Sequence, residues 1–192
     1  MWCFPGDHDQ AAATVQPFRE MVTPAIDMAG PIPFTALQSI FDPLMPPGLQ
    51  WYWNHDFFTE MTDEAIDIAL EQFSLAPTML SGMHFYTVNG AVHKVGPNET
   101  AWNFREANFS QVIVGVDPEP ENKEAITKWS KAFWQAMHTH SAGGAYINMM
   151  MDEGQDRVKA AYRDNYPRLA AIKKKYDPTN LFHMNQNIKA IG

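Results

Sequence analysis

The sequence has a single cysteine, Cys3, in 192 residues, so neither an internal disulfide nor a cysteine-based metal site can form. It also lacks an apolar run long enough to span a membrane. Basic residues are few, 14 against 22 acidic ones, and the net charge is -8. Nucleic acid and anionic membrane surfaces are bound by concentrated basic patches, which this composition does not favour. We therefore expect no membrane span and no nucleic-acid partner.

The first residues of the chain are apolar and aromatic. Met1–Phe4 ends at Pro5-Gly6, a pattern that predicts a short strand with Cys3 as a core residue. No signal peptide is recognisable, because Met1 leads directly into this aromatic segment. The sequence therefore assigns no compartment to the protein.

Phosphate-binding loops and nucleophilic motifs are missing as well. The chain has 11 glycines, and the adjacent pair Gly143-Gly144 precedes a predicted strand rather than the helix start that a phosphate loop needs. There is no Gly-x-Ser-x-Gly elbow, and the seven histidines show no metal-ligand spacing. No motif in this chain alone predicts a bound dinucleotide, a metal site or a nucleophilic triad.

Hydrophobic periodicity predicts both helices and strands. Helices are expected at 9–28 (interrupted by two prolines), 32–41, 63–73, 121–137, 156–162 and 167–175, and strands at 49–53, 79–87, 91–95, 109–116 and 145–149. Asn89-Gly90 predicts a hairpin turn between the second and third strands. Because the elements follow no strict strand-helix-strand rhythm, the expected fold class is α+β. We expect an antiparallel sheet with helices packed on one face, and an irregular C-terminal tail.

Three segments carry the clearest burial patterns. Phe109–Val116 reads as a buried strand, and Thr62 is a suitable N-cap for the helix that follows it. Two apolar helix faces are predicted, one from Ala65, Ile66, Ala69, Leu70 and Phe73, and one from Ile126, Trp129, Phe133 and Met137. No feature indicates a domain boundary inside the chain.

The segment Gly143–Asn148 holds the one polar pair that suggests chemistry. On a strand, Tyr146 and Asn148 would share one face, with Ile147 on the other. A phenol beside an amide can accept or donate a proton and orient a ligand. The same pair is also typical of an ordinary polar pair on a sheet, and the residues by themselves leave both readings open.

Several segments resemble berberine-bridge-type flavin oxidoreductases, a branch of the vanillyl-alcohol-oxidase-like, PCMH-type FAD enzymes. The most specific is the closing run Lys175–Ile188, KYDPTNLFHMNQNI, which resembles the C-terminal signature of that family. Gly144–Asn148 resembles the family's Tyr-x-Asn strand. Weaker landmarks occur in the same order along the chain: Pro33–Gln38, Trp53–Phe58 and Phe104–Ala107.

The resemblance implies a division of the chain into two parts. Residues 1–142 would form a substrate-binding domain, and residues 143–192 a berberine-like segment that returns to an FAD domain. That FAD domain has no counterpart in this sequence. FAD is therefore expected only together with an FAD-binding domain or a partner chain that carries one.

The resemblance also implies roles for individual residues. Tyr146 would lie near the flavin as a candidate base or substrate-orienting hydroxyl, and Tyr146, Asn148, Asn185 and Asn187 would contact the cofactor. The implied reaction is oxidation of an alcohol, sugar or related C–H centre, with hydride transfer to FAD and dioxygen as electron acceptor. The small-molecule substrate would meet the strand 109–116, where Gln111 and Ile113 are the predicted contacts.

Two departures from the family keep other functions open. Alkaloid-oxidising relatives carry a glutamate base on the strand that here reads 109–116, and this strand contains no acid. The missing flavin half is also consistent with an inactive remnant, with a stand-alone module that binds a ligand or a protein, or with one chain of a split enzyme. Fold alone does not decide among these alternatives.

Overall fold

The computed structural model describes residues 3–189 and divides the chain into two compact units, residues 1–47 and 48–192. The first unit contains α1 (His8–Met21), α2 (Phe34–Gln38) and a 3-10 turn, Asp42–Leu44. Asp7 caps α1 by accepting the backbone N–H groups of Asp9 and Gln10. The sequence predicted this helix but extended it too far, to residue 28, and it did not predict the division at residue 47.

The N-terminal strand is not confirmed. Residues 1 and 2 of the predicted strand lie outside the described residues, and residues 3–5 have no regular secondary structure. Cys3 is exposed. Its prediction as a core residue is therefore wrong, because no partner strand pairs with this segment to bury it.

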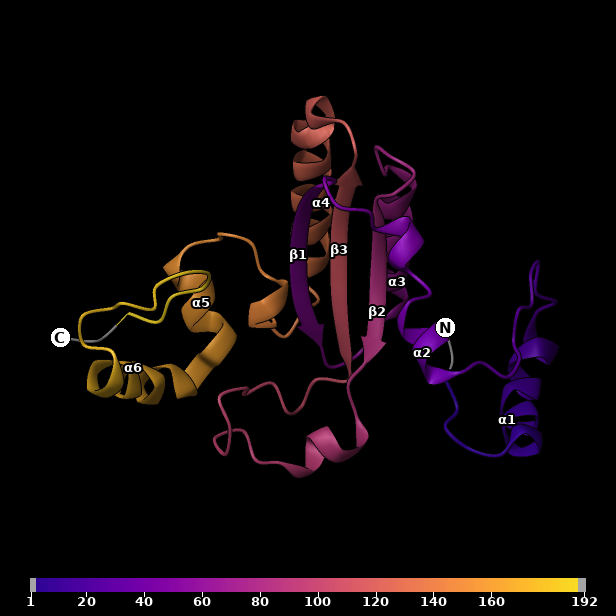
Figure 1. Cartoon of the computed structure of the whole chain (residues 1–192), viewed down its shortest axis with the longest axis horizontal. Coiled ribbons are helices and arrows are strands. Elements are labelled where there is room, and N and C mark those ends of the chain that lie inside the picture. Colours follow the sequence, from indigo (N-terminus) through magenta and orange to yellow (C-terminus); the bar gives the residue numbers. More distant parts are fainter. Residues whose placement is uncertain (1–2, 190–192) are drawn as a thin grey trace. The chain divides into compact units, whose positions relative to one another are not determined.

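The second unit is built on a three-stranded antiparallel sheet within the described residues, in the order β1-β3-β2 (Figure 1). The strands are β1 (Gln50–Phe58), β2 (Gly82–Thr87) and β3 (Phe109–Asp117). The central strand β3 pairs with both neighbours along its length. The predicted strand 109–116 is confirmed, and its apolar run reflects burial on both faces.

Two helices, α3 (Asp63–Ser74) and α4 (Lys123–His138), cover one face of the sheet (Figure 1). The predicted α4 stripe is confirmed, since all of its members are buried: Ile126, Trp129, Phe133 and Met137. Gly115 permits this close packing, because a Cβ there would lie 2.7 Å from the backbone oxygen of Ile126. The expected α+β class, with helices on one face, is confirmed.

The predicted α3 face is only partly correct. Thr62 caps the helix as expected, by accepting the backbone N–H of Ala65 at 3.2 Å. Ala65 and Ala69 are buried, but Ile66 and Leu70 are 42% and 63% exposed. Helix α3 therefore contacts the core through Ala65, Ala69 and the partly buried Ile68, while Ile66 and Leu70 face away from the core.

The predicted hairpin at Asn89-Gly90 is wrong. Residues Gly90–Lys94 form a 3-10 turn, and strand β2 pairs instead with β3, which begins 22 residues after β2 ends. Contacts with residues further along the chain hold this loop. The His93 ring bonds to the backbone oxygen of Ala107, and Arg105 donates to the backbone oxygen of Val92 at 3.2 Å. These contacts replace the ladder that a local hairpin would have formed.

The C-terminal segment contains α5 (Gln155–Tyr162), α6 (Tyr166–Tyr176) and an irregular tail, as predicted. The two helices share a small core that includes Ala145, Val158, Ala161 and Ala170, with Ile188 of the tail packed against it. The tail is anchored by Gln186, whose amide donates to the backbone oxygens of Met150 and Met151. Figure 1 shows this segment beside β1, at the edge of the sheet.

Candidate functional site

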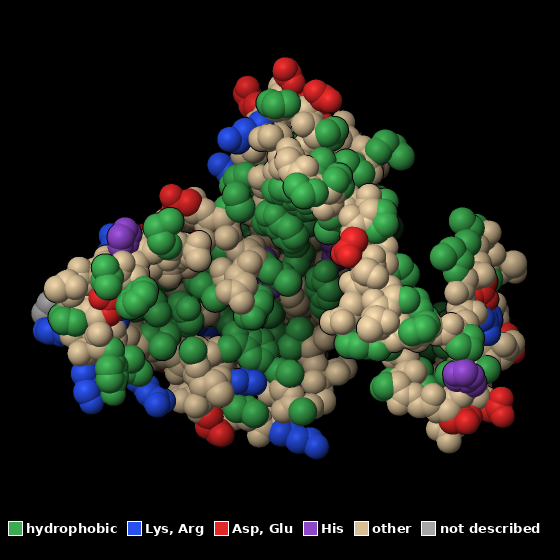
Figure 2. All heavy atoms as spheres, in the orientation of Figure 1, with side chains coloured by type: hydrophobic (Ala, Val, Ile, Leu, Met, Phe, Trp, Pro, Cys, Tyr) green, Lys and Arg blue, Asp and Glu red, His purple; other side chains and the backbone are tan. Residues whose placement is uncertain are grey.

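The face of the sheet opposite α3 and α4 is rich in apolar and aromatic side chains. Alternation along β1 places Trp51, Trp53, His55 and Phe57 on this face, which we call the open face. Trp51 and Trp53 are stacked, with ring centroids 5.5 Å apart, and they cover the valines of β3. Figure 2, which views this face, shows the apolar side chains gathered over the strands.

One end of the open face is closed by a loop. Phe57 stacks on Phe104 with a centroid distance of 4.9 Å, and Phe104 is fully buried. The guanidinium carbon of Arg163, in the turn that follows α5, lies 3.6 Å from the centroid of the Phe104 ring. The polar residues of the candidate site, Tyr146, Asn148 and His55, lie along the free edge of β1, beside this closed end.

Tyr146 and Asn148 lie side by side, but not on a strand. The predicted strand 145–149 is wrong: residues 143–146 are irregular and Ile147–Met149 form a 3-10 turn. The turn nevertheless brings the two side chains together, and the Asn148 amide donates to the Tyr146 hydroxyl at 3.0 Å. Tyr146 is 39% exposed. Its hydroxyl therefore keeps its own proton available for a ligand while the amide holds its oxygen.

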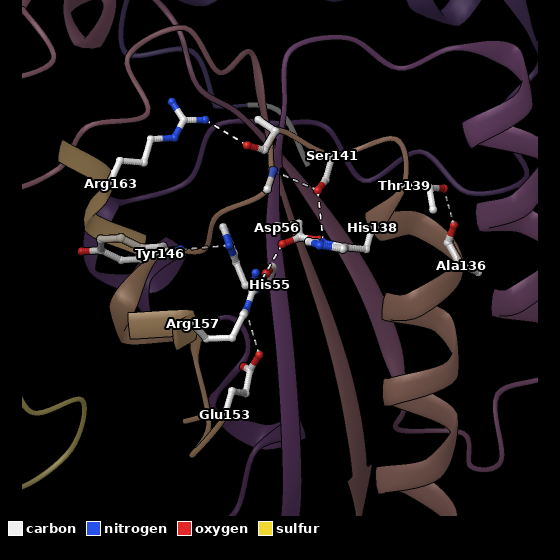
Figure 3. A network of polar contacts seen from close by, with 12 residues as sticks. His55, Asp56, Ala136, His138, Thr139, Ser141, Tyr146, Glu153, Arg157 and Arg163 are labelled. Carbon is white, nitrogen blue, oxygen red and sulfur yellow. Dashed lines mark hydrogen bonds and ion pairs between the residues drawn. The ribbon is translucent and has the colours of Figure 1, made fainter. Parts of the chain in front are cut away.

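His55 ties the Tyr146 segment to the sheet. Its Nδ1 accepts the backbone N–H of Tyr146 at 3.0 Å (Figure 3). Its Nε2 lies 2.6 Å from Ser110 Oγ. The ring is fully buried. Burial, with a smaller contribution from the positive charge of Arg157, lowers the pKa of His55 to about 3. The imidazole is therefore neutral at physiological pH.

Asp56, the next residue of β1, points to the other face of the sheet and joins three elements. Its buried carboxylate accepts from His138 Nδ1 of α4 at 2.6 Å and from Arg157 Nη2 of α5 at 3.1 Å (Figure 3). Arg157 also donates to the backbone oxygen of His55 and to Glu153. Burial raises the pKa of Glu153 above its ordinary value, against the opposing charge of Arg157. The network fixes the C-terminal segment to the edge of the sheet.

Two of the predicted cofactor residues line the same cavity. The cavity has a volume of about 400 Å³ and is lined by Ile147, Asn148, Met150, Tyr162, Met184, Asn185 and Gln186. Asn185 has a positive φ of 58°, so the tail turns sharply there. Asn148 and Asn185, distant in the sequence, are therefore brought together.

Asn187, the third predicted amide, does not line this cavity. Its backbone oxygen accepts from Gln155 at 3.1 Å. Its side-chain oxygen is buried and has no hydrogen-bond partner within the described part of the chain. An unpaired buried acceptor is costly, so this atom is suited to a donor supplied from outside the described residues.

Gln111 and Ile113 lie on the face of the sheet that α3 and α4 cover. Ile113 is paired with Asn54, whose side chain accepts from Ser130 of α4, and it packs in the core beneath the helices. Gln111 is also fully buried, with both amide atoms unpartnered among the described residues. Their role in binding substrate remains a prediction, and this placement gives it no support.

Sequence reasoning missed His55, Asp56 and Arg157 as parts of the site. A signal existed in β1: the polar run Asn54-His55-Asp56 lies inside an otherwise aromatic strand. Buried polar residues of this kind need partners, so such a run indicates a network. The partners themselves, from α4 and α5, could not be located without the fold.

Neither a metal cluster nor a membrane-spanning helix is found in the described part of the chain. No group of three or more histidine, cysteine or acidic residues lies close enough to hold a metal ion there. Among the same residues, every helix is too short or too polar to cross a bilayer.

The buried neutral His55 predicts sensitivity to acid. From pH 6.5 down to about 3, the unfolded chain binds a proton at His55 that the folded chain excludes. This difference should lower the free energy of unfolding by about 1.4 kcal/mol per pH unit as the pH falls through that range. Urea denaturation at pH 6.5 and 5.0 measures the loss. The His55→Asn variant should lose less stability over this interval, whereas His8→Asn, at an exposed position, should behave as the unmodified chain. Equal losses in all three would contradict the assignment.

Comparison with known proteins identifies the C-terminal segment. Residues 145–189 match the family model "Berberine and berberine like". The match begins next to Tyr146 and Asn148 and includes Asn185 and Asn187. The residues around the cavity thus fall within one family segment.

Relatives extend the similarity to the whole chain. An FAD-linked oxidoreductase of Dictyostelium discoideum is 24% identical over 193 residues, covering 100% of this chain and 42% of that protein. A xylooligosaccharide oxidase of Thermothelomyces thermophilus is 33% identical over 110 residues, covering 53% of this chain and 22% of the oxidase. The chain therefore spans less than half the length of the curated relatives it matches.

The fold agrees with the sequence relatives. The structure of the BBE-like 1 protein of Physcomitrella patens superposes with a TM-score of 0.78 at 21% identity, covering 97% of this chain and 43% of that one. A likeness at this identity establishes the shared fold. The family segment and the sequence match along the whole chain show that this chain is similar to a C-terminal part of berberine-bridge-enzyme-like FAD-linked oxidoreductases.

Proposed function

We propose that this chain supplies the substrate side of an FAD-linked oxidoreductase that oxidises an alcohol or sugar. The observation that carries the proposal is the placement of Tyr146. The residue is partly exposed, its hydroxyl accepts from Asn148, and its backbone is bound to buried His55. A cavity lined in part by Asn148, Asn185 and Gln186 adjoins it. This arrangement offers a fixed proton-exchanging group beside a space for a ligand.

The residues of this region fit a flavin. Asn148 and Asn185 present amide groups to the cavity, and the buried side-chain oxygen of Asn187 lacks a donor. The ring edge of a flavin carries both N–H donors and carbonyl acceptors, which such amides can bind. We propose that Tyr146, Asn148, Asn185 and Asn187 would hold FAD when an FAD-binding domain or partner chain supplies it. Bound FAD would supply the two-electron acceptor for the substrate hydride.

The residues of this chain would accept the proton that the substrate hydroxyl loses. In an alcohol-to-carbonyl oxidation, the substrate carbon loses a hydride and its hydroxyl loses a proton. Tyr146 would first release its own proton to solvent, and its phenolate oxygen would then orient that hydroxyl and take the hydroxyl proton, leaving a neutral phenol. The Asn148 amide, which donates to this oxygen at 3.0 Å, would stabilise the negative charge of the phenolate before the substrate proton is taken. His55 and Arg157 would keep the segment in place.

The substrate class is proposed from the surface and from one relative. The open face bordering Tyr146 carries the stacked rings of Trp51 and Trp53, which offer a flat apolar platform for a ring-shaped substrate. The relative from Thermothelomyces thermophilus is a xylooligosaccharide oxidase. We therefore propose a sugar or sugar-like alcohol as substrate and dioxygen as the electron acceptor. Residues 1–142 would bind the substrate, and residues 143–192 would lead the chain back to the FAD-binding domain.

A direct test uses the protein purified from its natural source. We expect flavin absorption in the visible spectrum, and we expect this absorption to bleach when a suitable sugar or alcohol is added without oxygen. Admitting dioxygen should restore the colour. A flavin that no member of a panel of mono-, di- and oligosaccharides and primary alcohols can bleach would reject the proposed substrate class.

A second candidate function is a binding module without redox chemistry. The observation that favours it is the exposure of large apolar side chains on the tail, where Leu181, Phe182 and Met184 are 71%, 77% and 79% exposed. Exposed apolar patches mark interaction surfaces. A colourless natural species of 21.8 kDa that binds no added FAD would support this candidate against the first.

A further inference from the structure

The segment that carries Tyr146 runs beside the free edge of β1 and is held there by three hydrogen bonds. Ala142 N–H donates to the Phe57 oxygen at 2.7 Å, and Phe57 N–H donates to the Gly144 oxygen at 3.2 Å. The third bond joins Tyr146 N–H to Nδ1 of His55 at 3.0 Å. After Gly144 the segment leaves the backbone ladder, so the His55 side chain is the group of β1 that binds Tyr146 itself.

The two contacts of His55 select one form of its ring. A neutral imidazole carries one proton, so a nitrogen that accepts a hydrogen bond leaves the proton on the other nitrogen. Nδ1 accepts from Tyr146, and the proton therefore lies on Nε2, which donates to Ser110 Oγ at 2.6 Å. A doubly protonated ring would direct a second N–H at the N–H of Tyr146. The depressed pKa of His55, about 3, excludes that form at neutral pH.

The ring is itself held from several sides. Phe57 contacts it edge-on, with centroids 4.7 Å apart, and Arg157 binds the backbone oxygen of His55 at 3.0 Å. The charged and titratable groups around this point are Arg157, Asp56, Glu153 and His138: Arg157 binds both carboxylates, and His138 of α4 binds Asp56. His55 therefore has little freedom to turn, and its Nδ1 presents a fixed acceptor.

We propose that His55 is a positioning residue for Tyr146: through Nδ1 it fixes the backbone from which the Tyr146 hydroxyl reaches its ligand. The consequence for catalysis rests on the proposed function, whereas the bond itself does not. His55 touches neither cofactor nor substrate in this role. It acts by holding the phenol and its partner Asn148 at a constant place beside the open face.

Two variants of His55 separate the two contacts of the ring. In His55→Asn, the amide oxygen takes the place of Nδ1 and still accepts the Tyr146 N–H. In His55→Gln, the longer amide reaches the place of Nε2 and keeps the Ser110 contact, but it leaves Tyr146 without its acceptor. We expect hydrogen exchange at the Tyr146 amide, followed by ¹⁵N NMR, to be about tenfold faster in His55→Gln and near the unmodified rate in His55→Asn.

Turnover is measured on the same variants in the flavin-containing protein. We expect kcat to fall about tenfold in His55→Gln, with KM little changed, and to be largely restored in His55→Asn. Equal impairment of both variants, or unchanged exchange at Tyr146 in His55→Gln, would overturn the positioning role. The expected exchange rates in a protein that oxidises no alcohol or sugar would uphold the bond and reject the proposed function.

One measurement requires no substitution and therefore does not depend on the variants folding. ¹⁵N NMR of the histidine side chains at pH 7 distinguishes a protonated from an unprotonated Nδ1. We expect His55 to show a bare Nδ1 and a protonated Nε2. A proton on Nδ1 would exclude the bond to the Tyr146 N–H and overturn the proposal.

Discussion

The Tyr146→Phe variant is expected to lose turnover by a factor of about 10²–10⁴ while keeping its flavin, because it removes a single hydroxyl from the site. The benzene ring keeps the size of the side chain, and the backbone bond to His55 is unaffected. The Asn148 amide would lose its acceptor, but it lies at an exposed position where water can replace the hydroxyl. Steady-state oxidation rates and the visible spectrum of the purified variant measure the two quantities.

Tyr176→Phe is the matched control for this substitution. Tyr176 ends α6 and is 74% exposed, so removal of its hydroxyl should leave turnover unchanged. If Tyr146→Phe also turned over at the unmodified rate, Tyr146 would have no part in the chemistry. If it lost its flavin as well as its activity, the hydroxyl would serve cofactor binding rather than proton transfer.

The Gly144→Ala variant is expected to lose about 3 kcal/mol or more of its free energy of unfolding. A Cβ at this position would lie 1.6 Å from Cζ of Phe104. The Phe104 ring is fully buried between Phe57 and the guanidinium of Arg163, so it has no space to move into. Either the ring or the segment leading to Tyr146 must shift. Urea denaturation measures the loss.

The neighbouring glycine provides a control that separates the clash from backbone strain. Gly143 has φ of +83° but nothing within 4 Å of an added Cβ, so Gly143→Ala should cost only about 1–2 kcal/mol. The double variant Gly144→Ala with Phe104→Leu should be less destabilised than the sum of its single changes, since the smaller side chain relieves the contact. Strict additivity, or equal losses at both glycines, would show that the clash is not the cause.

The arrangement of β1 explains why one short strand matters to both stability and function. His55 on the open face binds the Tyr146 segment, and Asp56 on the opposite face binds α4 and α5. Neighbouring residues of a strand point to opposite faces, so these two adjacent side chains bind the C-terminal segment from both faces of the sheet. The C-terminal segment is thereby fixed to the sheet at its edge, where an unpaired strand would otherwise expose its backbone.

The hydrophobic pattern correctly predicted those helices and strands in which the spacing of apolar residues fits a single type of secondary structure. The α4 stripe follows helical spacing, and its four apolar members are buried as expected. Strand β3 contains the apolar run Val112–Val116, ends just before Pro118, and forms the centre of the sheet. In these segments propensity, pattern and tertiary contacts agree, so the sequence alone was sufficient.

Other local signals were overruled by distant contacts. Asn89-Gly90 is a strong hairpin signal, but β2 pairs with β3 instead, because the central strand offers a longer ladder and a core beneath it. The predicted strand at 145–149 is a turn, since Ala145 packs among α5 and α6 rather than in the sheet. The sequence could not tell which face of β3 holds Gln111 and Ile113, because the pattern of a strand buried on both sides gives no sign of which face carries helices.

The sequence by itself determined the α+β class, the main helices, the central strand and the family resemblance carried by the closing motif. It also singled out Tyr146 and Asn148 as neighbours, because they are two residues apart and are neighbours in a strand or a turn. Only the tertiary structure decided which groups join them. His55 is 91 residues from Tyr146, and Asp56 is 101 from Arg157. Hydrogen bonds over such separations depend on how whole elements pack, and no local period in the sequence records that packing.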